Sequence, residues 1–121
     1  MLSAYGKILR KIRIDNNELL NEMATKLKVS SALLSYIENG KREIPKDFTS
    51  KVIEVYALDA EVAEQLRAEE INDKKAVKVD LPPQASLVRR ETAMLFARTF
   101  NNMNDDVLAK IRELLEDSDG D

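Results

Sequence analysis

The chain has 121 residues and a net charge of −3, with 44% hydrophobic and 34% charged residues. It contains no cysteine and no histidine, so disulfides, the usual zinc sites and catalysis by Ser–His or Cys–His pairs lack the side chains they need. It shows no secretory signal and no apolar run near the roughly 20 residues that span a bilayer; we expect a cytoplasmic protein that enters no membrane, binds no metal or other cofactor and is not an enzyme.

Three helices are predicted in the first 40 residues. The first covers residues 4–14, where Ile8, Leu9 and Ile12 repeat with helical spacing. The Asp15–Asn17 cluster is a turn signal and offers an N-cap for the second helix. The apolar residues of that helix follow the same period: Leu19, Leu20, Met23, Ala24 and Leu27. Ser30 is a favourable N-cap for the third helix, which Asn39-Gly40 would end.

Two more helices complete the first part of the chain. Pro45 stands where a fourth helix would begin, with Asp47 in its first turn. Asp59 can cap a fifth helix that runs from residue 60 to about residue 72. Residues 1–73 are therefore predicted to form one five-helix domain.

The pattern changes over residues 77–81, the only strand candidate in the chain. Val77, Val79 and Leu81 alternate with Lys78 and Asp80, which is the period of a half-buried strand. A lone strand leaves its hydrogen-bonding edges open. The simplest partner is the same strand in a second copy of the protein.

Two further helices are predicted after Pro82-Pro83, over residues 85–101 and after the capping residue Asn104. Residues 74–121 would then be a dimerisation region made of one strand and two helices, although the helices could also simply extend the first core. The residues expected to form the dimer contact are Val77, Val79, Leu81, Leu95, Phe96, Phe100, Leu108, Ile111 and Leu115.

The charges are divided unevenly between the two parts. Residues 1–58 carry 10 Lys and Arg against 7 Asp and Glu, whereas residues 59–121 carry 9 against 15. A mildly basic half and an acidic half are compatible with one end that binds nucleic acid and one that does not. The carboxylate pairs Glu69-Glu70 and Asp105-Asp106 fall at positions predicted to face solvent or to cap a helix, which does not favour acid–base or metal chemistry.

Residues 20–39 have the spacing of two short helices that cross steeply after a tight turn. Such a unit needs a small residue where the backbones approach, here Ala24, and apolar residues on both inner faces and in the turn. Those apolar residues are Met23, Leu27, Val29, Leu34 and Ile37.

This spacing, together with LRKIR in the first helix and IENGKR at the end of the third, resembles the phage-repressor-like regulators of the Xre or Cro/C1 type. The resemblance covers about residues 5–58 and implies an all-α, lambda-repressor-like helix-turn-helix domain. Two positions depart from the family pattern. Lys28 occupies the turn position that is usually glycine, and Leu20 stands where a glutamine often contacts phosphate.

In that family the third helix enters the major groove of DNA. The resemblance implies that the residues near base edges are Ser31, Ala32, Ser35, Tyr36 and Arg42, and that those near phosphates are Ser30, Asn39 and Lys41. Arg10 and Glu38 resemble a structural ion pair between the first and third helices. For Tyr36, packing against the next helix is an equally good interpretation.

The sequence therefore predicts a regulator that binds double-stranded DNA sequence-specifically, most simply a repressor acting as a homodimer on a two-fold operator. The alternative is an antitoxin-type protein whose C-terminal region binds a protein partner, with DNA binding serving autoregulation.

Overall fold

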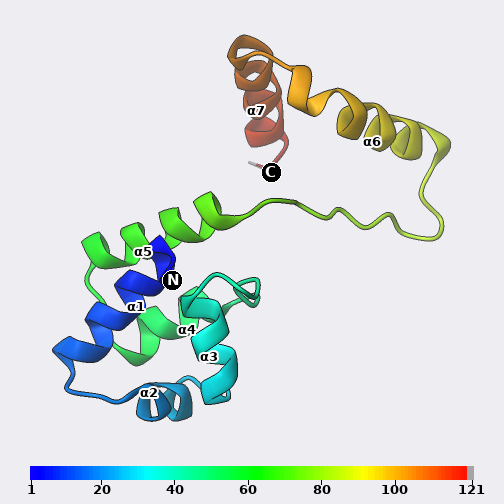
Figure 1. The fold of residues 1–121 in the computed structure, drawn as a ribbon. Coiled ribbons are helices and arrows are strands. Elements are labelled where there is room, and N and C mark those ends of the chain that lie inside the picture. The colour runs from blue at the N-terminus through cyan, green and yellow to red at the C-terminus, as the bar shows by residue number, and fades with distance from the viewer. Residues whose placement is uncertain (120–121) are drawn as a thin grey trace. The chain divides into compact units, whose positions relative to one another are not determined.

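The structure, a computed structural model, describes residues 1–119 and divides into two compact units, Met1–Val77 and Lys78–Asp121. The first unit contains α1 (Ala4–Asp15), α2 (Leu20–Lys26), α3 (Ser31–Glu38), α4 (Phe48–Val55) and α5 (Ala60–Asp73). The second contains α6 (Leu87–Thr99), the short 3-10 helix η1 (Phe100–Asn102) and α7 (Asp105–Asp119) (Figure 1). The division falls a few residues after the predicted boundary at 73/74.

The first unit encloses a single hydrophobic core to which all five helices contribute. α1 packs against both α3 and α5, while α2 packs against α3 and α4 against α5. The periodic apolar faces meet at the centre and exclude water, which is the main stabilising contribution. The buried core residues are Tyr5, Leu9, Ile12, Met23, Ala24, Leu27, Leu34, Ile37, Phe48, Val52 and Leu66.

Side-chain caps begin several helices where the sequence predicted them. The Ser30 hydroxyl oxygen accepts a hydrogen bond from the Leu33 N–H at 3.0 Å, and the Asp59 carboxylate accepts one from the Val62 N–H at 2.9 Å. Asn104 caps α7 in the same way. Each cap satisfies one of the N–H groups that have no partner within the helix.

Two helices begin differently from the prediction. α2 is capped from within, because the Glu22 carboxylate accepts the Leu19 N–H at 2.8 Å, and the Asp15–Asn17 cluster does not cap it. α4 begins at Phe48 rather than at Pro45. Asp47 precedes it with a positive φ of 65°, a backbone conformation that turns the chain sharply before the helix.

The predicted strand at residues 77–81 is absent, so that part of the fold prediction was wrong. The segment has no regular secondary structure, and Val77 and Val79 are 82% and 76% exposed. An extended segment becomes a strand only when a neighbouring strand completes its hydrogen bonds. No segment among residues 1–119 does so, and the fold is all-helical over that range.

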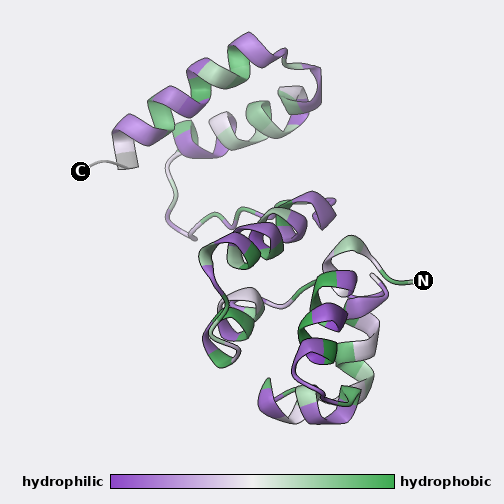
Figure 2. Cartoon of the chain, turned by 90° about the vertical axis from the view of Figure 1, so that its left-hand side faces the viewer, coloured by the Kyte–Doolittle hydropathy of each residue, from purple (hydrophilic) through white to green (hydrophobic). Residues whose placement is uncertain are grey.

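The second unit has no buried residue within its described part, residues 78–118. The Phe96 and Phe100 rings lie 5.3 Å apart, and Arg90 donates hydrogen bonds to the carbonyls of Pro82 and Pro83. These contacts hold α6 to its own flanking segments. Figure 2 shows hydrophobic and hydrophilic bands alternating along both α6 and α7. No helix in the described residues is long and apolar enough to cross a membrane.

Candidate nucleic-acid interface

The turn between α2 and α3 is built on Lys28, whose φ of 60° is left-handed. The Val29 N–H donates to the Ala24 carbonyl at 3.0 Å, and the Lys28 N–H donates to the Thr25 carbonyl at 3.2 Å. This pair of bonds satisfies the last carbonyls of α2, as helix ends with a left-handed residue do. Lys51 of α4 adds a 2.9 Å hydrogen bond to the Leu27 carbonyl. The turn that usually carries glycine thus forms with lysine and is held from a third helix.

α3 has one buried side and one open side. Leu34 and Ile37 are essentially fully buried, which anchors the helix on the core. The predicted base-edge residues Ser31 and Ala32 are exposed, and Tyr36 is 45% exposed. Ser35 is half-buried, and Arg42 is exposed in the following loop. The open side of α3 therefore consists mainly of short side chains.

The residues predicted to lie near phosphate differ in what their side chains already bind. The Ser30 oxygen accepts the Leu33 N–H, so its own hydroxyl hydrogen remains to be donated. The Asn39 amide donates one hydrogen bond to the Ser35 carbonyl at 2.8 Å, and thereby helps to close the end of α3. Lys41 is exposed, and its ammonium forms no ion pair among residues 1–119.

A glycine turn sets the direction of the chain after α3. Gly40 has a φ of 69°, its N–H donates to the Ile37 carbonyl, and the Lys41 N–H donates to the Tyr36 carbonyl at 2.8 Å. Glycine is favoured here because it adopts this conformation without steric cost. The turn places Lys41 and Arg42 directly beyond the last turn of α3.

The ion pair between α1 and α3 uses Arg13, not Arg10, which corrects the predicted pairing. The Arg13 guanidinium donates to both carboxylate oxygens of Glu38, at 2.5 and 3.2 Å, and the two side chains are only 12% and 5% exposed. Arg10 is exposed. Arg13 lies four residues after the buried Leu9 and therefore on the same face of α1, whereas Arg10 directly follows Leu9 and points about 100° around the helix, toward solvent.

The N-terminus of α1 also contacts the end of α3 through backbone atoms. The Ser3 N–H donates to the Glu38 carbonyl at 2.9 Å. A Cβ atom on Gly6 would lie 2.0 Å from that same carbonyl oxygen, so only glycine permits this approach. Glu38 is therefore held by its side chain and by its backbone, which fixes the orientation of α3.

A hydrogen-bonded chain that the sequence did not predict links α1, α4 and α5. Thr49 donates to the Glu70 carboxylate, so the Tyr5 hydroxyl must donate to the Thr49 oxygen, at 2.7 Å. Burial raises the pKa of Tyr5 above its ordinary value. Glu70, expected to face solvent, is half-buried. No pattern in the sequence predicted this series of hydrogen bonds, because Tyr5, Thr49 and Glu70 lie far apart along the polypeptide.

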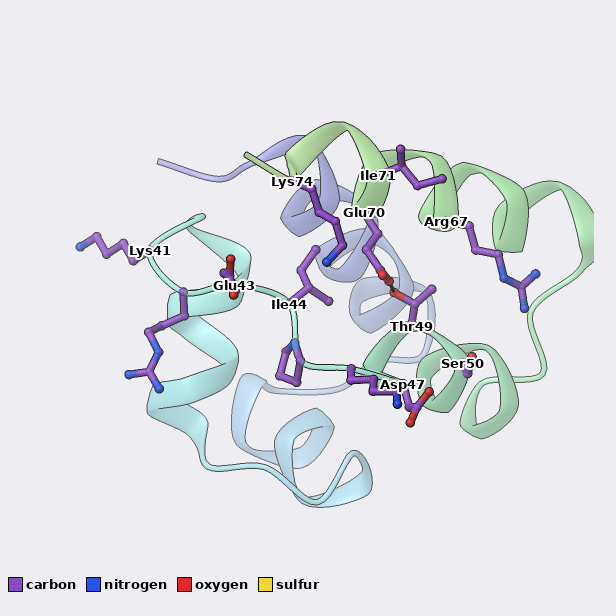
Figure 3. Close-up of a pocket in the computed structure, with 13 residues that line it drawn as sticks. Lys41, Glu43, Ile44, Asp47, Thr49, Ser50, Arg67, Glu70, Ile71 and Lys74 are labelled. Carbon is purple, nitrogen blue, oxygen red and sulfur yellow. Dashed lines mark hydrogen bonds between the residues drawn. The ribbon is translucent and has the colours of Figure 1, made fainter. Parts of the chain in front are cut away.

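An open cavity of about 930 Å³ lies beside these residues, between the loop at residues 41–47, the start of α4 and the end of α5. Figure 3 shows Glu70 pointing toward Thr49 along one wall, with Ile44 from the loop opposite Lys74. Charges of both signs line it, including Lys41, Glu43 and Arg67. The cavity separates the loop that carries Lys41 from the C-terminal part of α5.

A second unpredicted cluster ties the loop before α2 to the end of α4. The Tyr56 hydroxyl donates to the Glu18 carboxylate at 3.1 Å, and the Lys26 ammonium lies 3.2 Å from the other Glu18 oxygen. The same ammonium stands 5.5 Å from the centre of the Tyr56 ring. Burial, and donation to the Glu18 carboxylate, raise the pKa of Tyr56. The cluster braces the outer side of α2. Among the residues that the structure describes, no group of acidic side chains could hold a metal ion.

Two short helices joined by a left-handed turn, with the second anchored on one side and open on the other, define a helix-turn-helix unit. Over 50 residues the chain is 42% identical to the HTH-type transcriptional repressor RghR of Bacillus subtilis (strain 168). It is equally identical, again over 50 residues, to the uncharacterized HTH-type transcriptional regulator RghRB of the same organism. These similarities support the prediction of a helix-turn-helix regulator.

The similarity is limited in extent. It covers 41% of this chain but only 37% of RghR and 36% of RghRB, so the chain spans little more than a third of the length of the curated relatives it matches. No family model matches the chain, and no solved structure matches it.

Proposed function

We propose that the protein is a transcriptional regulator of the Xre or Cro/C1 type that binds double-stranded DNA through α3. The observation that carries the proposal is the division of α3 into a buried side, with Leu34 and Ile37, and an open side, with Ser31, Ala32 and Tyr36. A helix held in this way can enter the major groove without disturbing the core behind it. It binds DNA as its partner and carries out no catalysis.

Short side chains on the open side favour a close approach to the bases. Ser31 and Ser35 can exchange hydrogen bonds with several base edges, and Ala32 can contact a thymine methyl group. Such contacts discriminate weakly between sequences. Specificity therefore relies on Tyr36, on Arg42 and on the shape of the DNA.

The basic residues after α3 supply affinity that is independent of sequence. Lys41 and Arg42 are exposed and follow the fixed turn at Gly40, so they are positioned to meet the phosphate backbone. Ser30 and Asn39 keep one free hydrogen each for the same purpose, since each uses only part of its bonding capacity within α3.

Regulators of this kind usually bind DNA as two-fold dimers, with half-sites about 34 Å apart. We propose a cytoplasmic homodimer that represses by covering a promoter, with the second unit as its contact. An antitoxin-type role is the alternative, because the same unit exposes apolar residues such as Leu114 and Leu115 that a different protein could cover. Stable co-purification with the product of an adjacent gene would favour the alternative.

The test is a fluorescence-anisotropy titration of the full chain against DNA from upstream of its own gene and against a scrambled duplex. We expect tighter binding to the upstream DNA and an affinity that falls with salt. Lys41→Ala should weaken binding to both duplexes by a similar factor and reduce the salt slope by about 1.

Lys110→Ala is the matched control, since it removes the same charge from α7, outside the proposed interface. Equal binding to both duplexes, or binding that does not respond to salt, would contradict the proposal. An equal effect of Lys41→Ala and Lys110→Ala would contradict the assignment of Lys41.

A further inference from the structure

One face of α6 exposes four large apolar side chains. Leu87, Val88, Met94 and Leu95 are between 52% and 74% exposed. They are spaced by one, seven and eight residues, which places them on a single side of the helix. Such a cluster is costly to leave in water. We therefore expect another protein surface to cover these four side chains.

The apolar stripe of α7 is less exposed at its centre than the apolar face of α6. Its central residues Leu108 and Ile111 are already half-buried within the second unit. The residues of α6 that are partly covered are Arg90, Ala93 and Thr99, and of these Ala93 lies on the side of the helix opposite the exposed four. The open face of α6 is thus opposite the side that carries Ala93, while Arg90 and Thr99 lie at its two borders.

The same face carries two charges of opposite sign. Glu91 and Arg98 lie seven residues apart, both are exposed, and neither belongs to an ion pair within residues 1–119. Two helical turns separate them by about 10 Å along the axis. Their midpoint falls between Met94 and Leu95, so the face is apolar at its centre with one acidic and one basic residue at equal distances.

This arrangement is complementary to itself. When two copies of the helix meet antiparallel about a two-fold axis at Met94 and Leu95, each Glu91 faces Arg98 of the partner subunit. The apolar centres then cover each other. A parallel arrangement would instead bring Glu91 against Glu91 and Arg98 against Arg98, which is destabilising.

We propose that α6 forms the dimer contact by packing antiparallel against α6 of a second copy, with two Glu91–Arg98 ion pairs flanking Met94 and Leu95. The inference rests on the homodimer proposed above and adds which surface forms it and in which orientation. It also replaces the strand pairing expected from residues 77–81, since that segment forms no strand.

Charge reversal in the full chain tests the interface by sedimentation equilibrium. Glu91→Arg places Arg opposite Arg in both contacts, and Arg98→Glu places Glu opposite Glu. Each variant should self-associate at least about tenfold more weakly than the wild type. An equimolar mixture of the two should recover the dimer, because every facing pair is then opposite in charge.

Two further variants make the test specific. The double variant Glu91→Arg/Arg98→Glu should dimerise with itself but not with the wild type. Arg89→Glu is the matched control, because it makes the same charge change as Arg98→Glu on α6 but outside the exposed face, and should leave dimerisation unchanged.

The outcomes separate this inference from the proposed function. A dimeric wild type whose association none of the reversals alters would overturn the α6 contact and leave the homodimer intact. A wild type that stays monomeric at all concentrations, or that associates only with a different protein, would overturn the homodimer as well. Binding of the monomeric variants to a single half-site, measured by anisotropy, reports DNA recognition independently of both.

Discussion

The two units differ in burial even where their helices have similar lengths. α1 has 12 residues and buries four of them, including Leu9 and Ile12, while α6 has 13 residues and buries none. Five helices in the first unit enclose a common centre, which two helices cannot do. The contrast shows that helical periodicity indicates which residues need covering but not what covers them. In the first unit, other helices of the same chain cover these residues.

The largest expected effect tests this contrast with one substitution in each unit. Leu34→Ala removes a fully buried side chain and should lower the free energy of unfolding of the first unit by about 3 kcal/mol. Leu87→Ala removes the same atoms from a 70% exposed position and should change monomer stability by less than about 0.5 kcal/mol. Urea denaturation of the two variants, at a protein concentration too low for dimerisation, measures both changes in the free energy of unfolding. Similar losses for the two variants would mean that α6 is already covered within its own chain.

A smaller effect is expected for the ion pair that fixes α3 inside the first unit. Arg13→Ala leaves the Glu38 carboxylate buried without its hydrogen-bond donor and should cost about 2 kcal/mol. Arg10→Ala is the matched control, and being exposed it should be nearly neutral. Thermal unfolding of both variants decides between the two arginines. An equal cost for Arg10 would restore the pairing that the sequence pattern suggested.

The smallest effect concerns the turn between α2 and α3. Lys28 adopts a left-handed backbone conformation that glycine adopts more easily. Lys28→Gly should therefore raise the stability of the first unit by roughly 0.5–1 kcal/mol without changing α6 or α7. Urea denaturation followed by circular dichroism measures it. A loss of stability would mean that the lysine side chain contributes more than its backbone costs.

Local patterns predicted the helices well and the tertiary contacts poorly. Ser30, Asp59 and Asn104 cap helices as expected, because capping depends on residues three positions apart. Glu38 was expected to pair across to α1, but which arginine it meets depends on how the two helices cross. The Tyr5–Thr49–Glu70 chain was not predicted for the same reason.

The residues proposed to contact the bases show the same difference between local patterns, which were predicted, and side-chain contacts, which were not. Ser31, Ala32 and Tyr36 follow from helical spacing once Leu34 and Ile37 are assigned to the core. That Asn39 closes its own helix by bonding to the Ser35 carbonyl could not be read from the spacing, since it depends on a side-chain rotamer. The alternation at residues 77–81 misled because a period of two is necessary for a half-buried strand but does not supply a neighbour.

The sequence by itself determined where the helices form, how three of them begin, and that residues 20–39 make two short helices around a tight turn. Those features depend on interactions within a few residues of the chain. Only the tertiary structure decided that Arg13 holds Glu38, that Gly6 admits the end of α3, and that the face of α6 around Met94 and Leu95 remains uncovered. Those features depend on how separate helices meet, which periodicity along one helix does not specify.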